Sequence, residues 1–489
     1  MQRCDTAPTV KEAESSVRVV SAAWLMGILL LSACVSPSRT DLPNVGPFTP
    51  LHALPLGSAV GDVTSVAAVV WTRTEGPARV QVEWEAEAEG TLKEPSRSEV
   101  MMTSTQRDYT VAVPLEGLAP ATSYRYRIFS QPQEAQASWE PRATGRFRTA
   151  SSSDQSESVR FVWSGDIGGQ EFCRQAGDGY AILDRVRQVE PAFAILLGDL
   201  IYADHRCPSP PNAPGSEFIA STLDEFRSKH RYQREDAAFQ RFLAEVPVHA
   251  IWDDHEVRDN FSGPSEALMP IGRQALLEYW PIRTDAQDPF RLYRRIHRGA
   301  DLDVFILDTR QYRSRNGEPD GPGKTMLGVA QRDWLIDGLL TSKATWKVIA
   351  TSVPLSLLKP GVKVPGNDSW AHAEDGTGFR TELKLILDAA RRGGVRNMVW
   401  LAADVHLAQV NEYDPEGAGR AEFYEFVAGP LSAKPGKLSQ PEPSLRPHIL
   451  YADAGFMNFG VVTVTGRTLQ MEIVDQTGAT RFAHSITAK

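Results

Sequence analysis

Four short segments in the second two-thirds of the chain each place potential metal ligands directly after an apolar run. A single Gly-Asp pair at the end of a strand usually forms a turn or a helix cap. Four such ends with carboxylate, imidazole and phenol side chains instead predict a two-metal hydrolytic site. The segments are Ser164-Gly-Asp166, Gly198-Asp199-Leu-Ile-Tyr202, Trp252-Asp253-Asp254-His255-Glu256 and Ala403-Asp404-Val-His406.

The apolar runs before these segments are short and rich in β-branched and aromatic residues, which is typical of strands buried on both faces. Ligands at the carboxyl ends of such strands meet at one edge of an open α/β sheet, where these folds place their sites. We therefore expect the four segments to converge. The predicted strands are Val159–Trp163, Phe193–Leu197, Val246–Trp252 and Met398–Ala402.

The ligand types indicate which metals the site would bind. Carboxylate, imidazole and phenol donors suit hard or borderline ions such as Fe(III), Mn, Zn or Ca, whereas a soft copper site would favour thiolates. Asp199 can bridge two ions with its two oxygens. Two such ions clamp a phosphoryl group and generate a metal-bridging hydroxide that attacks in line. The other predicted ligands are Asp166, Tyr202 and His406 for one ion, and Asp254 and Asp404 for the other.

His255 is predicted as the catalytic residue that protonates the leaving oxygen or holds a phosphate oxygen. Its neighbours Asp253 and Glu256 are expected to be structural. Arg310, at the end of another predicted strand, could hold substrate phosphate or form a salt bridge with Asp308 or another carboxylate. Two further residues are substrate-binding candidates, Arg258 and Asn260.

Length, composition and charge restrict the class of protein. The chain has 489 residues, of which 42% are hydrophobic and 23% are charged, and its net charge is −9. This length predicts two or three domains. The acidic balance argues against a general surface for nucleic acid or anionic membranes, which would need clustered Lys and Arg. Any phosphate group must therefore be bound locally.

The N-terminus predicts export. Residues 19–31 form an uncharged stretch that is too short to span a bilayer and is typical of a signal peptide. It leads into Leu31-Ser-Ala-Cys34, which resembles a bacterial lipobox. We predict a lipoprotein signal peptide over residues 1–34, lipidation of Cys34 and a membrane-anchored protein in the periplasm or at the outer membrane or cell surface. A plain cleaved signal or a chance apolar stretch is the alternative.

Residues 35–50 contain several prolines and predict a semi-extended linker. Residues 51–150 then alternate apolar and polar side chains between turn clusters, which predicts a small all-β domain. The segment Leu115–Tyr126 resembles the E–F corner region of fibronectin type III sandwiches, and about 100 residues fit that architecture. The predicted strands are Val66–Arg73, Arg79–Glu85, Tyr109–Pro114 and Tyr124–Phe129.

From residue 159 to residue 489, strands alternate with amphipathic helices, which predicts a layered α/β or α/β/β/α domain. Residues 205–215 are rich in Pro and Gly and predict a surface loop near the site. We expect loops over residues 205–231 and 431–454 to determine the substrate. The predicted helices are Tyr180–Val189, Arg273–Trp280, Gln331–Leu340 and Arg380–Ala390.

If Cys34 is acylated, Cys173 and Cys207 remain in an oxidising compartment that permits a disulfide. Each follows one of the ligand segments by a few residues, so a bridge would join two loops at the mouth of the site. Two free thiols or a soft metal ligand are the alternatives.

At these residues the chain resembles the PhoD-like alkaline phosphatase/phosphodiesterase family, a branch of the calcineurin-like metallophosphatases. The resemblance implies an exported hydrolase of phosphomonoesters or phosphodiesters, with some members acting on phospholipids or teichoic-acid-like polymers. It also implies a β-sandwich followed by a metallophosphatase domain, and Fe(III) with Ca(II) as one metal set, with Mn or Zn as alternatives. Besides the four segments, it rests on Gly61-Asp62, Val70-Trp-Thr-Arg73, Leu307-Asp-Thr-Arg310 and Glu425-Phe-Val-Ala-Gly429-Pro430.

The resemblance also implies roles for single residues. Asp199 would be the bridging carboxylate and Tyr202 an iron-bound tyrosinate. Asp166 stands where some members carry Cys, so a thiolate-linked iron is not expected. The alternative functions are a phospholipase D-like phosphodiesterase and a non-catalytic binding lipoprotein with structural metals. His255 argues against the second, because a structural metal site has no need of a histidine that is not a ligand.

Overall fold

The computed structural model describes residues 54–87, 94–134, 138–358 and 368–489, which all belong to one unit over residues 43–489. The predicted signal peptide, its lipobox cysteine Cys34 and the linker over residues 35–50 lie outside the described residues. Within the described ranges, no helix combines the length and the hydropathy that a membrane crossing requires.

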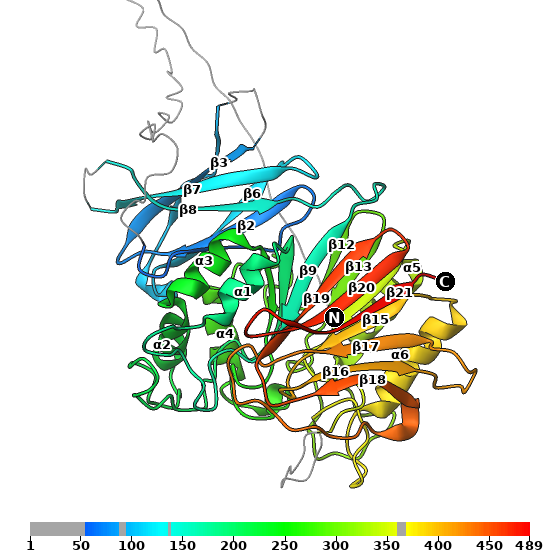
Figure 1. The fold of residues 1–489 in the computed structure, drawn as a ribbon. Coiled ribbons are helices and arrows are strands. Elements are labelled where there is room, and N and C mark those ends of the chain that lie inside the picture. The colour runs from blue at the N-terminus through cyan, green and yellow to red at the C-terminus, as the bar shows by residue number, and fades with distance from the viewer. Residues whose placement is uncertain (1–53, 88–93, 135–137, 359–367) are drawn as a thin grey trace, which may run out of the picture. The chain divides into compact units, whose positions relative to one another are not determined.

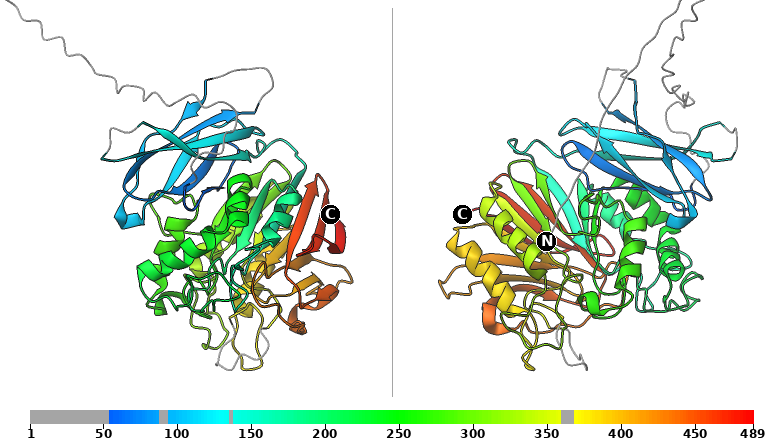
Figure 2. Two further views of the ribbon diagram at one scale, coloured as in Figure 1. Left: turned by 60° about the vertical axis from the view of Figure 1, so that its left-hand side comes forward. Right: turned by 180° about the vertical axis from the view of Figure 1, so that it is seen from behind.

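Two mixed sheets form the core of the C-terminal domain, as Figures 1 and 2 show. The first continues at β11 into strands of the N-terminal domain. Its C-terminal-domain strands are, in order, β21 (Thr480–Thr487), β20 (Thr468–Asp475), β19 (Asn458–Thr465), β9 (Val159–Ser164), β10 (Phe193–Leu197) and β11 (Val248–Ile251). The second contains β12 (Arg294–Arg298), β13 (Leu302–Ile306), β14 (Trp346–Ala350), β15 (Met398–Ala402), β17 (Phe423–Val427), β16 (Ala408–Tyr413) and β18 (Pro447–Asp453).

The alternation of side chains along each strand divides the core into two clusters. In β13, Val304 and Ile306 join the cluster between the two sheets, whereas Phe305 joins the cluster on the opposite face. Trp163 of β9 meets Phe426 of β17 across the space between the sheets, with ring centroids 6.2 Å apart. Each central strand is therefore buried on both faces, as its apolar sequence predicts.

Helices cover the outer faces of the two sheets. Four belong to the side of the first sheet, and two cover the second. The apolar face of α6 illustrates the cause, since Leu383, Ile386 and Leu387 recur at helical spacing and are buried. The predicted α/β/β/α layering is confirmed. The helices are α1 (Ile182–Gln188), α2 (Leu223–Arg234), α3 (Ala237–Glu245), α4 (Met269–Tyr279), α5 (Gly328–Thr341) and α6 (Arg380–Arg392).

Two segments that we expected to be loops contain regular structure. Residues 223–231 belong to α2, which begins with a capping box in which Thr222 accepts from the backbone N–H of Glu225 and the Glu225 side chain returns the bond. The sequence pattern of this cap, Thr-x-x-Glu, indicates the start of a helix. Residues 447–453 form β18, which pairs with β16. The remainder of both segments is irregular apart from a short turn of 3₁₀ helix at Pro443–Leu445.

The N-terminal domain is a sandwich of two sheets around its own apolar core, which confirms the predicted all-β domain. Val70 and Val113 from one sheet share this core with Val80 and Ile128 from the other. One sheet contains β1 (Ser58–Gly61), β2 (Ala67–Arg73) and β6 (Thr110–Glu116). The other contains β3 (Ala78–Ala86), β4 (Ser96–Arg97), β5 (Met101–Met102), β7 (Ser123–Pro132) and β8 (Glu140–Arg148).

The two domains share a sheet, a feature that the sequence pattern does not reveal. Gly61 of β1 pairs in parallel with Val248 of β11, so the sandwich extends the first sheet beyond β11. The next residue, Asp62, accepts hydrogen bonds from Arg294 and from His249 Nδ1 at 2.8–3.1 Å. The Gly61-Asp62 segment therefore joins the sandwich to the strand that precedes the third ligand segment.

Candidate metal centre

The predicted ligands leave their strands through unusual backbone conformations. Asp166, Asp199 and Asp404 follow β9, β10 and β15 with φ values of 63°, 50° and 69°, and His406 has a φ of 56°. Residues other than glycine seldom adopt positive φ, at a cost of about 1–3 kcal/mol each. Gly198 permits the close packing here, because a Cβ at this position would lie 2.4 Å from the Cβ of Asp253.

The first group of ligands combines Asp166, Asp199 and His406, each buried, with one ligand atom from each within 4.8 Å of the others. His406 Nε2 lies 3.3 Å from Asp166 Oδ1 and 3.1 Å from the Tyr202 hydroxyl. His406 Nδ1 lies 2.6 Å from the carbonyl oxygen of Lys434 and donates to it. With its proton on Nδ1, the neutral imidazole has a free lone pair on Nε2, and this is the tautomer that a metal ligand bound through Nε2 requires.

The second group forms around Asp254, which is fully buried. Its carboxylate clusters within 4.8 Å with Asp199 and His255, and separately with Asp253 and Asp404. The backbone N–H of Asn260 donates to Asp254 Oδ2 at 2.6 Å and fixes its orientation. Asp199 thus belongs to both groups, which is the arrangement that a bridging carboxylate needs.

The residues fit a pair of bound cations. Asp166 Oδ2 is buried and makes no hydrogen bond to any residue in the described part of the chain. Burial raises the pKa of Asp199 well above its usual range, and the nearby carboxylates of Asp254, Asp253 and Asp166 raise it further. Such a cluster of buried acids is unfavourable unless positive charge compensates it. The donors are the carboxylate, imidazole and phenol groups that hard or borderline ions accept.

Tyr202 lies inside this carboxylate cluster. Burial raises the pKa of its hydroxyl well above the usual range, and Asp199 and Asp166 add to the effect. The hydroxyl therefore stays neutral beside carboxylates alone, and its ionisation would require a strongly charged cation nearby.

His255 is held by a carboxylate that sequence reasoning missed. Its Nδ1 lies 2.8 and 3.0 Å from the two carboxylate oxygens of Asp204. Burial raises the pKa of Asp204, but the charge of His255 and hydrogen bonds from His205 and His255 outweigh burial and lower the pKa overall. Because the ionised carboxylate can only accept, Nδ1 of His255 donates to it.

The other nitrogen of His255 faces the ligands. Nε2 lies 4.0 Å from Asp199 Oδ2, and the ring stacks on Tyr202 with centroids 4.3 Å apart. The imidazole is thus fixed by Asp204 on one side and directed at the carboxylate cluster on the other. The signal for Asp204 was present in the sequence, since this residue stands two residues after Tyr202, where the second ligand segment ends.

Arg310 forms a salt bridge with buried carboxylates. Of the two roles expected from the sequence, substrate binding or a salt bridge, the structure contains the salt bridge. Its guanidinium is fully buried and donates to both oxygens of Asp253 at 2.7 and 3.0 Å, and to Asp368 at 3.1 Å. Asp308 does not form that bridge but accepts the backbone N–H of Arg310 at 3.1 Å. Because no part of the Arg310 side chain is exposed, this structure offers no guanidinium here for a substrate phosphate.

The other two candidates for substrate contact lie at the edge of the site. Arg258 donates to the carbonyl oxygens of Val257 and Ala220 at 2.8 and 2.6 Å. Asn260 acts through its backbone on Asp254, and its carbonyl accepts from Asn316 at 2.8 Å. In this conformation both residues shape the loop after the third ligand segment.

Glu256 and the disulfide stabilise the loops that carry the ligands. Glu256 accepts the backbone N–H groups of Asp199, Leu200 and Asp253 at 2.7–3.3 Å, which is the structural role expected for it. Cys173 and Cys207 form a disulfide with a Cα–Cα distance of 5.9 Å. Of the three alternatives for these cysteines, the structure contains the disulfide that joins the loops after β9 and β10.

Comparison with known proteins supports the resemblance. Residues 161–473 match the family of PhoD-like phosphatases, and residues 49–151 match the N-terminal domain of PhoD-like phosphatases. The Bacillus subtilis (strain 168) protein alkaline phosphatase D is 26% identical over 406 residues. That alignment covers 74% of this chain and 66% of the relative, just under two thirds of its length.

Two solved structures share the fold. The structure of PhoD aligns with a TM-score of 0.72 and 21% identity, and the alignment covers 91% of this chain and 94% of that one. The purple acid phosphatase PPD1 from yellow lupin (Lupinus luteus) seeds aligns with a TM-score of 0.62 and 14% identity, over 88% of this chain and 74% of that one. The family resemblance inferred from the ligand segments is confirmed.

Proposed function

Because the chain belongs to the PhoD-like phosphatase family, we propose that it is a metal-dependent phosphoesterase that hydrolyses phosphomonoesters, phosphodiesters or both. One observation carries the proposal. His255, anchored by Asp204, is directed at two groups of buried ligands that share Asp199. The name of the curated relative, alkaline phosphatase D, supports the same class of reaction.

In this proposal the ligand groups would divide between two ions, as the sequence analysis expects. Asp199 would hold both, and Fe(III) with Ca(II) is the metal pair that we propose from the family resemblance. When bound, the ions supply positive charge to the phosphoryl group and lower the pKa of a water molecule. The other ligands would be Asp166, Tyr202 and His406 for one ion, and Asp254 and Asp404 for the other.

His255 supplies the proton that the leaving alcohol needs. Asp204 stabilises the protonated imidazole through Nδ1, so Nε2–H is available on the side of the ligands. The stacked ring of Tyr202 fixes the imidazole plane. The proton can therefore pass from Nε2 to the departing oxygen without a prior rotation of the ring.

The proposal is tested by comparing His255→Ala with His448→Ala, since His448 is an exposed histidine on β18. Both variants and the unmodified chain are assayed with a phosphomonoester and a phosphodiester of glycerol, whose alcohol leaving group needs a proton, after elemental analysis of each sample. We expect His255→Ala to keep its metals and to lose about 10²–10⁴-fold in kcat, with His448→Ala unchanged. Bound metal without hydrolysis of either ester by the unmodified chain would favour the non-catalytic binding protein instead.

We also propose that the protein is exported and anchored by a lipid at Cys34. The apolar stretch over residues 19–31 and the lipobox-like tetrad support this proposal, and a disulfide between Cys173 and Cys207 fits an oxidising compartment. Metabolic labelling with radioactive palmitate tests it. Label in the unmodified protein and none in Cys34→Ser is the expected result, and equal labelling of the two would contradict it.

A further inference from the structure

A third group of potential metal ligands lies beside the metal centre. It consists of Asp204, His205 and His255, and one ligand atom of each lies within 4.8 Å of the others. Asp204 and His255 form the contact that orients the catalytic imidazole. His205 has no part in that chemistry, although its ring lies in the same cluster.

The two histidines converge on one carboxylate oxygen. His205 Nδ1 lies 3.0 Å from Asp204 Oδ1, and His255 Nδ1 lies 2.8 Å from the same atom. The two ring planes are 78° apart and the ring centroids are 4.9 Å apart, so both rings direct a nitrogen at this oxygen without stacking on each other. Two imidazole nitrogens and one carboxylate oxygen therefore surround a single position.

The spacing of these atoms is close to that of a zinc site. Two ligands that each lie about 2.0–2.1 Å from a tetrahedral Zn²⁺ are about 3.3 Å apart. The contacts at 2.8 and 3.0 Å therefore need to open by only roughly 0.3–0.5 Å to admit the ion. The ion would replace the protons on the two Nδ1 atoms, because a histidine binds metal through a nitrogen that carries no proton.

The loop that carries His205 is fixed close to the cluster. The buried Lys229 donates to the carbonyl oxygens of His205 and Ser216 at 2.6 and 3.2 Å. Two residues further along the loop, Cys207 is joined to Cys173 by the disulfide. The backbone of His205 is thus held independently of its side chain.

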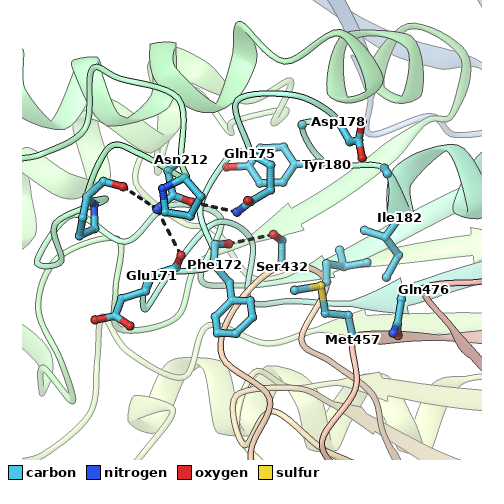
Figure 3. Close-up of a pocket in the computed structure, with 15 residues that line it drawn as sticks. Glu171, Phe172, Gln175, Asp178, Tyr180, Ile182, Asn212, Ser432, Met457 and Gln476 are labelled. Atoms are coloured by element: carbon cyan, nitrogen blue, oxygen red, sulfur yellow. Dashed lines mark hydrogen bonds between the residues drawn. The ribbon is translucent and has the colours of Figure 1, made fainter.

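The loop is also fixed at a second point, which Figure 3 shows. The buried Asn212 donates to the carbonyl oxygens of Glu171 and Pro208 at 3.2 and 2.9 Å, and it accepts from Gln175 at 2.9 Å. An ion would therefore bind ligands that are already in place, and its affinity would not be reduced by the cost of ordering the loop.

One side of the cluster is open to solvent. The side chain of His205 is 38% exposed, whereas those of Asp204 and His255 are 8% and 4% exposed. An ion can therefore enter past His205 and keep a water molecule as its fourth ligand. Three protein ligands with one open position are a common arrangement for accessible zinc ions.

We propose that Asp204, His205 and His255 form a separate binding site for a divalent transition metal of the zinc type, and that an ion bound there inhibits hydrolysis. Imidazoles with a carboxylate suit Zn²⁺, whereas Ca²⁺ prefers a larger set of oxygen ligands. The binding does not depend on the proposed phosphoesterase function. The inhibition rests on that function, because the ion would separate Asp204 from His255 Nδ1 and so remove the contact that orients the catalytic ring.

Zinc binding and zinc inhibition are measured on the same protein. The full chain, loaded with its catalytic metals, is dialysed against radioactive Zn²⁺, and its zinc, iron and calcium contents are determined. Hydrolysis of a glycerol phosphoester is then followed at increasing Zn²⁺, and the rates of each protein are divided by its own zinc-free rate.

The variants separate this site from other histidines. His205→Phe keeps an aromatic ring but removes the ligand, and His205→Ala is a second variant in case the phenylalanine disturbs the loop. His448→Phe is the matched control, because His448 is another exposed histidine and its Nδ1 lies 2.9 Å from a carboxylate oxygen of Glu412.

We expect the unmodified chain and His448→Phe to bind one zinc ion in addition to the ions of the catalytic centre, and to be inhibited by it. In His205→Phe the additional ion should be absent, and inhibition should require at least roughly tenfold more zinc. Loss of an outer hydrogen-bond partner of a metal ligand already costs about 10- to 100-fold in affinity, so loss of a ligand should cost no less. Ca²⁺ at the same concentration should not inhibit.

Three results would overturn the inference. They are the absence of an additional zinc ion in the unmodified chain, zinc that enters only in exchange for iron or calcium, and equal zinc inhibition of His205→Phe and the unmodified chain. Failure of the unmodified chain to hydrolyse the ester would instead refute the proposed function and the inhibition with it. The dialysis needs no activity and would still decide whether the zinc site exists.

Discussion

The contact between Asp204 and His255 gives the most specific prediction about catalysis. Asp204→Asn keeps the shape of the side chain but removes its charge. The two oxygen contacts at 2.8 and 3.0 Å lie in a region where the side chains of His255 and Asp204 are only 4% and 8% exposed, so solvent screens them little. Loss of a hydrogen bond to a charged group costs about 1.5–3 kcal/mol, which corresponds to roughly a 10- to 150-fold lower kcat.

The assay is the rate of glycerol release from a saturating glycerol phosphoester, with metal content and melting temperature measured on the same preparations. Asp259→Asn is the control, because it removes the same charge from an exposed side chain four residues after His255 in the sequence. We expect kcat to fall in Asp204→Asn alone, at unchanged metal content. An unchanged kcat in a folded, metal-loaded Asp204→Asn variant would refute the positioning role of this carboxylate.

Three further predictions concern metal binding and stability. Asp199→Ala should lose metal and activity together, because both ligand groups share this carboxylate, and full metal occupancy by elemental analysis would count against the bridging role. Arg310→Met should lower the free energy of unfolding by about 3–5 kcal/mol in urea titrations, since it leaves the buried Asp253 without its cation, and an unaltered midpoint would contradict this account. Burial raises the pKa of Asp303, but hydrogen bonds from His297, Arg295 and Ser342 outweigh burial and lower the pKa to about 2 from 3.8. The stability from this carboxylate, about 2 kcal/mol, is therefore present above pH 4 and lost as the pH falls toward 2, and Asp303→Asn should remove that part of the pH dependence.

Much of the layering could be predicted because burial on both faces leaves a local signature. The runs that became β10 and β15 are continuous and apolar, and β9 is apolar from Phe161 to Trp163 after the exposed Arg160. The ligand segments follow these runs directly. The carboxyl ends of the parallel strands β9, β10 and β11 meet at one edge of the first sheet, so the convergence of their segments followed from the pattern. β15 belongs to the second sheet, so the expectation that all four segments meet at the edge of one sheet was wrong for Asp404 and His406.

Other features depend on contacts between distant segments and leave no local pattern. The pairing of Gly61 with Val248 joins positions far apart in the chain, and nothing in either segment specifies the other. The same holds for the ion pair of Arg310 with Asp253, where sequence reasoning left substrate binding and a salt bridge equally open. Helix α2 does have a local pattern, because its capping box is present in the sequence as Thr-x-x-Glu. The expectation of a loop over these residues was therefore wrong.

The central claim is that the buried ligand groups hold metal ions that the hydrolysis of phosphoesters requires. The most direct test measures metal content and ester hydrolysis on one sample of the purified full chain, before and after removal of metal with a chelator and after its return. The account predicts about two ions per chain, activity that disappears with them and activity that returns with them. Hydrolysis that persists in the metal-free chain would contradict it.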